Sequence, residues 1–124
     1  MRRHFDHIDL RVRSLKEVES FYETLLPALG FTHAVGIEGW LTYQADADIA
    51  EFFGITESPT HVPNESRIAF WAESKAEVDR LGAILRTAGA RNIEGPMDYE
   101  AGYYAVFFED PSGNRLEICH RVKL

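Results

Sequence analysis

The chain opens with an alternation of apolar and polar side chains over residues 4–13. A period of two predicts a β-strand with one face against a core and one face turned away from it. The predicted strand carries Ile8, Leu10 and Val12 on its buried face, and His7, Asp9 and Arg11 on the opposite face. The polar side chains on this second, open face are therefore candidates for a site.

The period then changes to three or four residues. Apolar side chains recur at this spacing from Val18 to Leu29, which predicts an amphipathic helix. The segment Ser14-Leu-Lys-Glu17 has the pattern of a capping box and predicts where this helix begins, and a glycine follows its end. Because proline interrupts helical hydrogen bonding, Pro27 predicts a kink or an early end.

The second half of the chain repeats this pattern at an offset of about sixty residues. Residues 7–18 align with residues 67–78, and Ser14 matches Ser74. The repeat predicts a second strand over 67–73 and a second capped helix that ends at a glycine. Self-similarity on this scale indicates two copies of one supersecondary unit, whose matching positions are expected to face each other across a pseudo-twofold axis.

Strand-like segments follow each predicted helix. They cover residues 32–36, 40–45 and 49–53 in the first half, and residues 92–95, 103–109 and 115–121 in the second. The segment Asp110–Asn114 is rich in turn-forming residues and predicts a tight turn. Residues 54–66 form the longest irregular stretch and join the halves, and residues 98–102 form a second predicted loop. Each half therefore has the predicted order β-α-β-β-β.

Composition narrows the class of protein. The chain has 124 residues, of which 45% are hydrophobic, which suits one domain or two half-domains that share a core. A formal net charge of −7 argues against nucleic acid or an anionic membrane as a partner, because both require a basic face. No apolar run approaches the roughly 20 residues that span a bilayer, and the first residues do not have a signal-peptide pattern. A single cysteine, Cys119, excludes an internal disulfide, and together these features predict a cytoplasmic protein.

The open faces of the predicted strands bring a few polar residues into matching positions. The repeat relates His7 to Arg67, and a second alignment matches Glu51 with Glu117. If the halves pack around their axis, these four side chains converge. Polar groups that converge in an apolar hollow form either a candidate site or a costly buried cluster.

Several segments together are similar to one protein family. They are residues 7–15, 21–22, 29–31, 67–70 and 102–117, the last of which ends in Asp-Pro-Ser-Gly-Asn-Arg-Leu-Glu. In these segments, which span almost the whole chain, the sequence resembles the vicinal oxygen chelate superfamily, also called the glyoxalase, bleomycin-resistance and extradiol dioxygenase family.

Pattern and resemblance predict an α+β fold. We expect two pseudo-symmetric βαβββ modules that form a curved, partly open mixed sheet around a central cavity, with the helices outside. Within a single domain, module one is expected at about residues 1–56, a linker at about 57–65 and module two at about 66–124. The resemblance also implies a homodimer, and unpaired sheet edges on a small protein fit that expectation.

In this superfamily the inward residues bind a divalent metal. The resemblance matches His7 and Glu117 to ligands and places Glu51 near a third, but Arg67 stands where a histidine is usual. A guanidinium only donates hydrogen bonds and stays charged, so it cannot coordinate a metal. Two unit charges about 4 Å apart repel by roughly 4 kcal/mol at an effective dielectric of about 20. We therefore expect a degenerate site in which Arg67 pairs with the glutamates. Such a site would hold no metal or a weakly bound Ni, Mn, Zn or Fe ion, with His61 as a remote replacement ligand.

Two classes of function follow. The first is a small-molecule-binding protein of the bleomycin-resistance kind, in which Arg67 orients an anionic or carbonyl-bearing ligand in a cavity between the modules. The second is a metal-dependent lyase, isomerase or dioxygenase that holds its metal with His7, Glu117 and a third ligand. A metal-free enzyme that uses Arg67 as its electrophile lies between them. The catalytic candidates are Glu117, Glu51 and Arg67, and the ligand-binding candidates are Arg67, Asp9, Arg11, Trp71, Tyr103 and Tyr104.

Structural roles compete with some of these assignments. Asp9 and Arg11 can pair with each other instead of touching a ligand. Tyr103 and Tyr104 are adjacent in a predicted strand, so one faces each side and one of them belongs to the core. An aromatic residue such as Trp71 is more often a core residue than the wall of a pocket.

Overall fold

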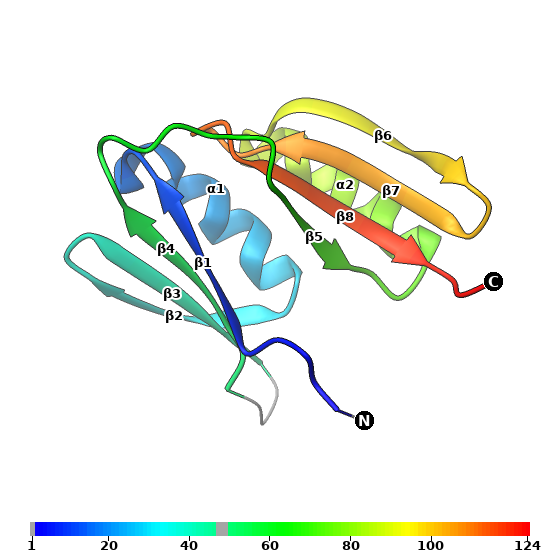
Figure 1. Ribbon diagram of the computed structural model, residues 1–124, viewed down its shortest axis with the longest axis horizontal. Coiled ribbons are helices and arrows are strands. Elements are labelled where there is room, and N and C mark those ends of the chain that lie inside the picture. Colours follow the sequence, from blue (N-terminus) through cyan, green and yellow to red (C-terminus); the bar gives the residue numbers. More distant parts are fainter. Residues whose placement is uncertain (1, 47–49) are drawn as a thin grey trace. The chain divides into compact units, whose positions relative to one another are not determined.

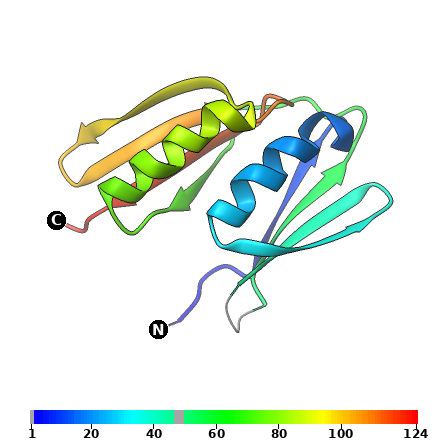
Figure 2. The same cartoon turned by 180° about the vertical axis from the view of Figure 1, so that it is seen from behind.

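The computed structural model describes residues 2–46 and 50–124. The chain divides into two compact units, Met1–Val62 and Pro63–Leu124, called unit 1 and unit 2 below. In the described residues each unit contains one helix and one four-stranded sheet. Figure 1 and the reverse view in Figure 2 show how these elements follow one another. The boundary between the units falls inside the stretch expected to be a linker.

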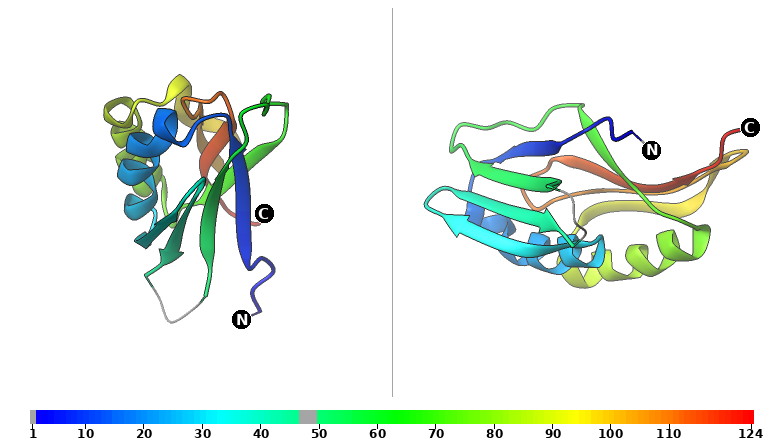
Figure 3. Two further views of the ribbon diagram at one scale, coloured as in Figure 1. Left: turned by 90° about the vertical axis from the view of Figure 1, so that its left-hand side faces the viewer. Right: turned by 90° about the horizontal axis from the view of Figure 1, so that it is seen from below.

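Unit 1 consists of β1 (His7–Val12), α1 (Leu15–Ala28), β2 (Phe31–Ile37), β3 (Trp40–Ala45) and β4 (Phe52–Glu57). The strand order is β1-β4-β3-β2. Strand β1 runs parallel to β4, and the other two pairs are antiparallel. The helix covers one face of this sheet, which leaves the other face open (Figure 3).

Unit 2 repeats this topology. It consists of β5 (Arg67–Trp71), α2 (Lys75–Ala88), β6 (Arg91–Glu100), β7 (Tyr103–Glu109) and β8 (Arg115–Arg121). The strand order is β5-β8-β7-β6, with β5 parallel to β8. The predicted α+β class with two βαβββ modules is confirmed, and each module has its own mixed sheet, which is not closed.

Each unit buries the apolar stripe of its helix against the inner face of its own sheet. In unit 1 the buried side chains are Val12, Val18, Phe21, Tyr22, Leu25, Leu26, Tyr43, Phe53 and Ile55. In unit 2 they include Phe70, Val78, Leu81, Leu85, Val106, Phe108, Leu116 and Ile118. Burial of one such side chain contributes about 1.5–3 kcal/mol, so these stripes supply most of the driving force for each unit. Neither helix of the described residues is long and apolar enough to cross a membrane.

The two predicted capping boxes behave differently. In α2 the Ser74 hydroxyl accepts a hydrogen bond from the backbone N–H of Glu77 at 3.0 Å, as the pattern predicts. In α1 the side chain of Ser14 makes no capping bond. The carboxylate of Glu57 instead accepts from the N–H of Leu15 at 2.9 Å. Glu57 can do so because it pairs with Val12 at the ends of β4 and β1, next to the start of the helix.

The end of α1 and two strand boundaries differ from or refine the predictions. The helix ends at Ala28, one residue after Pro27. Strand β4 runs from Phe52 to Glu57, so the predicted strand 49–53 was placed too early; Ile49 lies outside the described residues. Strand β6 continues through the predicted loop at 98–102 as far as Glu100, with three register shifts against β7. The predicted strand stopped at Gly95, but β6 continues through Gly95 and Pro96, because the bulged pairing with β7 accommodates these two residues.

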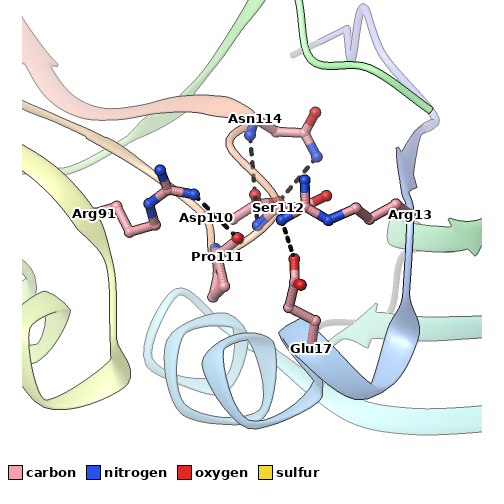
Figure 4. A network of polar contacts seen from close by, with 7 residues as sticks. All are labelled: Arg13, Glu17, Arg91, Asp110, Pro111, Ser112 and Asn114. Atoms are coloured by element: carbon pink, nitrogen blue, oxygen red, sulfur yellow. Dashed lines mark hydrogen bonds and ion pairs between the residues drawn. The ribbon is translucent and has the colours of Figure 1, made fainter. Parts of the chain in front are cut away.

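The predicted turn between β7 and β8 is held by its first residue. The carboxylate of Asp110, which is fully buried, accepts hydrogen bonds from the backbone N–H groups of Ser112 and Asn114 at 2.8 and 3.0 Å (Figure 4). The side-chain amide of Asn114 donates a third bond to it, and Arg91 of β6 donates to the carbonyl of Pro111 at 3.3 Å. These bonds fix where β8 begins and so which of its side chains reach the open face.

Candidate functional site

The open face of unit 1 starts with His7 at the beginning of β1. The alternation predicted for this strand is confirmed, since Val12 is fully buried whereas His7, Asp9 and Arg11 are exposed. The imidazole of His7 stacks on the ring of Phe52 with centroids 4.4 Å apart, and its Nδ1 lies 2.7 Å from a carboxylate oxygen of Asp6. His7 therefore has both an aromatic and an acidic neighbour within its own unit.

Asp9 and Arg11 contact each other on this face. Arg11 Nη1 lies 3.2 Å from Asp9 Oδ2, and the hydroxyl of Thr56 donates to Asp9 Oδ1 at 2.8 Å. The pairing considered from the sequence is thus present, and it holds the carboxylate in place. A ligand-binding role for these two residues stays a prediction.

Strand register corrects the matching of Glu51 with Glu117. Asp9 pairs with Gly54 in unit 1, and its repeat counterpart Ala69 pairs with Glu117 in unit 2. The residue equivalent to Glu117 is therefore Gly54, whereas Glu51 precedes β4 by one residue. The local similarity of the two segments was misleading, because pairing register, and not composition, decides which residue reaches which face.

Glu117 is the most buried charged residue of the open face of unit 2. It lies on β8 between Leu116 and Ile118, which point to the helix side, and it is only 6% exposed. The hydroxyl of Tyr103 on β7 donates a short hydrogen bond to Glu117 Oε2. Burial raises the pKa of Tyr103 well above its usual value, and the hydrogen bond to the carboxylate raises it further. Burial also raises the pKa of the neighbouring Cys119 thiol, and the charge of Glu117 adds to this shift.

Arg67 reaches across the same face. Its guanidinium carbon lies 4.5 Å from the centroid of the Phe107 ring on β7. Because β8 lies between β5 and β7, the side chain must cross β8 on the face that carries Glu117. Within the described part of unit 2 the expected ion pair between Arg67 and Glu117 is not formed, and the guanidinium contacts an aromatic ring instead.

The structure separates the two adjacent tyrosines. Tyr103 is on the open face beside Glu117, whereas the hydroxyl of Tyr104 donates to Asp79 of α2 at 2.5 Å. Tyr104 is therefore on the helix side and is not brought to the candidate site. Trp71 is not a core residue, because it is 65% exposed, and it pairs with Cys119 in the register of β5 and β8.

Sequence reasoning missed two members of this face, Tyr99 and Arg121. The ring of Tyr99 lies edge-on to Phe107 with centroids 4.9 Å apart, and the guanidinium carbon of Arg121 lies 4.0 Å from the centroid of Tyr103. The period of two along β8 already placed Arg121 on the same face as Glu117. No signal pointed to Tyr99, because its segment was predicted to be a loop.

Neither unit by itself has the side chains of a usual divalent metal centre. At the positions that correspond to ligands in the resemblance, the register places His7 and Gly54 in unit 1, and Arg67 and Glu117 in unit 2. Each unit therefore offers one side chain with a lone pair at these positions, whereas metal centres commonly use three or four protein ligands. His61, the expected replacement, lies in a turn where its N–H bonds to Ser58. Across residues 2–46 and 50–124, no group of three or more His, Cys, Asp or Glu side chains is arranged to hold a metal ion.

Comparison with known proteins agrees with this topology. The chain is 29% identical over 122 residues to the uncharacterized protein YqjT of Bacillus subtilis (strain 168), which covers 90% of this chain and 94% of that protein. It is similar in structure to a glyoxalase/bleomycin resistance protein from Albidiferax ferrireducens T118, with 28% identity and a TM-score of 0.79 over 95% of this chain and 98% of that one.

A more distant relative shares the fold alone. A point mutant of the genomically encoded fosfomycin resistance protein FosX from Listeria monocytogenes, complexed with Mn(II) and 1S,2S-dihydroxypropylphosphonic acid, is 17% identical, with a TM-score of 0.71 over 100% of this chain and 94% of that one. Residues 4–118 match the sequence model of the Glyoxalase/Bleomycin resistance protein/Dioxygenase superfamily. This match covers most of the chain, which therefore belongs to that superfamily.

Proposed function

We propose that the protein binds a small anionic or carbonyl-bearing molecule and anchors it through Arg67 in place of a metal ion. The observation that supports this most directly is the presence of an exposed arginine, Arg67, whose guanidinium contacts an aromatic ring. In the resemblance it stands where a histidine ligand is usual, and it is exposed. Within the described part of the chain its guanidinium has an aromatic ring as its neighbour and no carboxylate partner.

A guanidinium can replace the electrostatic part of what a metal ion does. It carries a permanent positive charge and five N–H donors in a planar fork, which suits a carbonyl or carboxylate oxygen. Glu117 supplies an acceptor on the adjacent strand, and Tyr103 holds it in place. The protein would thus bind through a cation, a buried carboxylate and aromatic rings.

Metal titration tests this proposal. We would measure the metal content of protein purified without added metal, and then titrate it with Mn, Ni and Zn by calorimetry. The wild-type protein should bind these ions weakly and below one per chain. Arg67→His removes the repelling charge and adds a ligand, so it should bind at least about tenfold more tightly. Arg80→His, the same exchange on α2, is the control and should not change the affinity.

Two results would contradict the proposal. One is tight, stoichiometric metal binding by the wild-type protein, which would favour the metal-dependent enzyme. The other is a fragment screen by ligand-detected NMR in which carboxylates and ketones bind equally well to the wild-type protein and to Arg67→Met. Arg80→Met serves as the control variant in the screen.

A further inference from the structure

We infer that the open face of the unit 2 sheet binds a neutral, flat ring that carries a carbonyl acceptor beside an N–H donor, as in a lactam or an imide. The inference rests on the proposed function and narrows its ligand to the carbonyl-bearing class. It depends on Arg67 and Glu117, which lie on neighbouring strands without pairing.

A donor and an acceptor lie on neighbouring strands of this face. Glu117 pairs in register with Ala69 on one side and with Phe107 on the other. The side chain of Arg67 crosses β8 on the face that carries Glu117 and reaches the ring of Phe107, and within the described part of unit 2 it forms no ion pair with Glu117. Tyr103 donates to one carboxylate oxygen and the Cys119 thiol also bonds to this carboxylate, which can accept about four hydrogen bonds in total. The pair therefore retains N–H donors on one member and acceptor capacity on the other.

The charges of the pair favour a neutral ligand over an anion. An anion that approaches Arg67 is repelled by the carboxylate of Glu117 on the neighbouring strand, so part of its attraction to the guanidinium is offset. A cation is attracted by Glu117 but repelled by Arg67. A neutral group gains from both side chains when its carbonyl faces the guanidinium and its N–H faces the carboxylate.

The surrounding side chains favour a flat ring. Phe107, Tyr99 and Tyr103 form a row of aromatic rings, with centroids 4.9 Å apart for the first pair and 6.1 Å for the second pair. The face of Phe107 carries the planar guanidinium of Arg67, and it can stack on a planar ring once that side chain moves aside. On β5 the residue paired with Glu117 is Ala69, which is exposed. Because its side chain is only a methyl group, it leaves room for a ligand beside the carboxylate. Arg67, which is also exposed, would move its guanidinium from the ring of Phe107 to the carbonyl oxygen of the ligand.

Three matched probes test the inference on the full chain. They are quinolin-2(1H)-one, its N-methyl derivative, which lacks the donor, and quinoline-2-carboxylate, which is an anion of similar size. Binding would be followed by calorimetry and by the fluorescence of the exposed Trp71. The lactam should bind best. The N-methyl derivative should bind about tenfold more weakly or worse, because it covers the Glu117 carboxylate without donating a hydrogen bond to it. Arg67→Met and Glu117→Gln should each weaken lactam binding by a similar factor, whereas Arg80→Met should not.

The outcomes separate this inference from the proposed function. Tighter binding of the carboxylate than of the lactam, lost in Arg67→Met, would overturn the inference and leave the proposed function standing. Equal binding of the lactam and its N-methyl derivative, or no binding of either, would also overturn it. The comparison of these two probes uses the wild-type protein, so it decides the question even if Glu117→Gln does not fold.

Discussion

At the scale of single residues, the open face of unit 2 contains two buried polar groups, the carboxylate of Glu117 and the hydroxyl of Tyr99, which differ in their hydrogen bonding. Glu117 is buried, and it accepts a hydrogen bond from Tyr103. The hydroxyl of Tyr99, on the same face, is also buried but has no hydrogen-bond partner in the residues that the structure describes. An unsatisfied buried hydroxyl costs free energy, whereas a satisfied one contributes modestly to stability.

This contrast predicts opposite effects for two equivalent substitutions. Tyr99→Phe should leave the free energy of unfolding unchanged or raise it by up to about 1 kcal/mol, because it removes a buried group without a partner. Tyr103→Phe should lower it by about 1–2 kcal/mol, because the buried Glu117 carboxylate loses the hydrogen bond from the Tyr103 hydroxyl. Urea unfolding of the two variants measures both effects. A larger loss for Tyr99→Phe than for Tyr103→Phe would contradict the assignment.

The raised pKa of Tyr103 predicts how stability depends on pH. The folded protein holds this proton more tightly than the unfolded chain, in which tyrosine titrates near pH 10. Its contribution is therefore fully present below about pH 10 and is lost as the pH rises above it toward the folded-state pKa. Unfolding free energies measured between about pH 8.5 and 11 should fall, and the fall should be smaller in Tyr103→Phe. An equal fall in both proteins would show that Tyr103 does not contribute.

At the scale of secondary structure elements, the repeat encodes the same helix twice but caps it in two ways. In α2 the capping box forms within the helix, through Ser74 and Glu77. In α1 the same pattern is present, but the strand residue Glu57 supplies the acceptor. A local pattern predicts where a helix begins, and the tertiary neighbours decide which side chain satisfies its free N–H groups.

The different caps predict different responses to alanine. Ser74→Ala should lower the free energy of unfolding by about 1 kcal/mol, because α2 loses its cap. Ser14→Ala should have little effect, since Ser14 makes no capping bond. Glu57→Ala should cost about as much as Ser74→Ala, because α1 loses its acceptor there. Urea unfolding followed by circular dichroism compares the three, and equal costs for the two serine variants would be the contradicting result.

At the scale of the whole molecule, each unit has its own helix, its own sheet and its own core. Each sheet ends in strands that pair on one side only, β1 and β2 in unit 1 and β5 and β6 in unit 2. Unpaired edges invite pairing with another chain unless they are covered. The homodimer expected from the sequence would cover such edges, and it stays a prediction.

Sedimentation equilibrium tests the predicted homodimer directly. The mass in solution should be twice the 14.1 kDa of the chain at micromolar concentration. If an edge strand pairs across the dimer, replacing one of its apolar residues with glutamate should shift this mass toward that of one chain. Arg80→Glu on the exposed side of α2 is the control and should leave the mass unchanged. A mass of one chain for the wild-type protein at all concentrations would exclude the homodimer.

Hydropathy periods and the internal repeat were sufficient to predict the fold class, both helices and the open face of β1. These features depend on neighbours close in the chain, where a period of two or of 3.6 residues alone decides which side chains share a face. The same reasoning also placed Glu117 and Arg67 on open faces. It could not predict that β6 continues through Gly95 and Pro96, because the bulges that permit this form only against β7.

The identity of the candidate site was decided by the tertiary structure. Which residue matches Glu117 depends on the pairing of β1 with β4, and this register places Gly54 there instead of Glu51. The choice of Phe107, and not Glu117, as the neighbour of Arg67 and the presence of Tyr99 on the same face likewise depend on strands far apart in the chain. The sequence by itself determined which side chains are available and which way each strand turns them. Only long-range pairing decided which of them meet, because contacts between strands are set by register and not by local pattern.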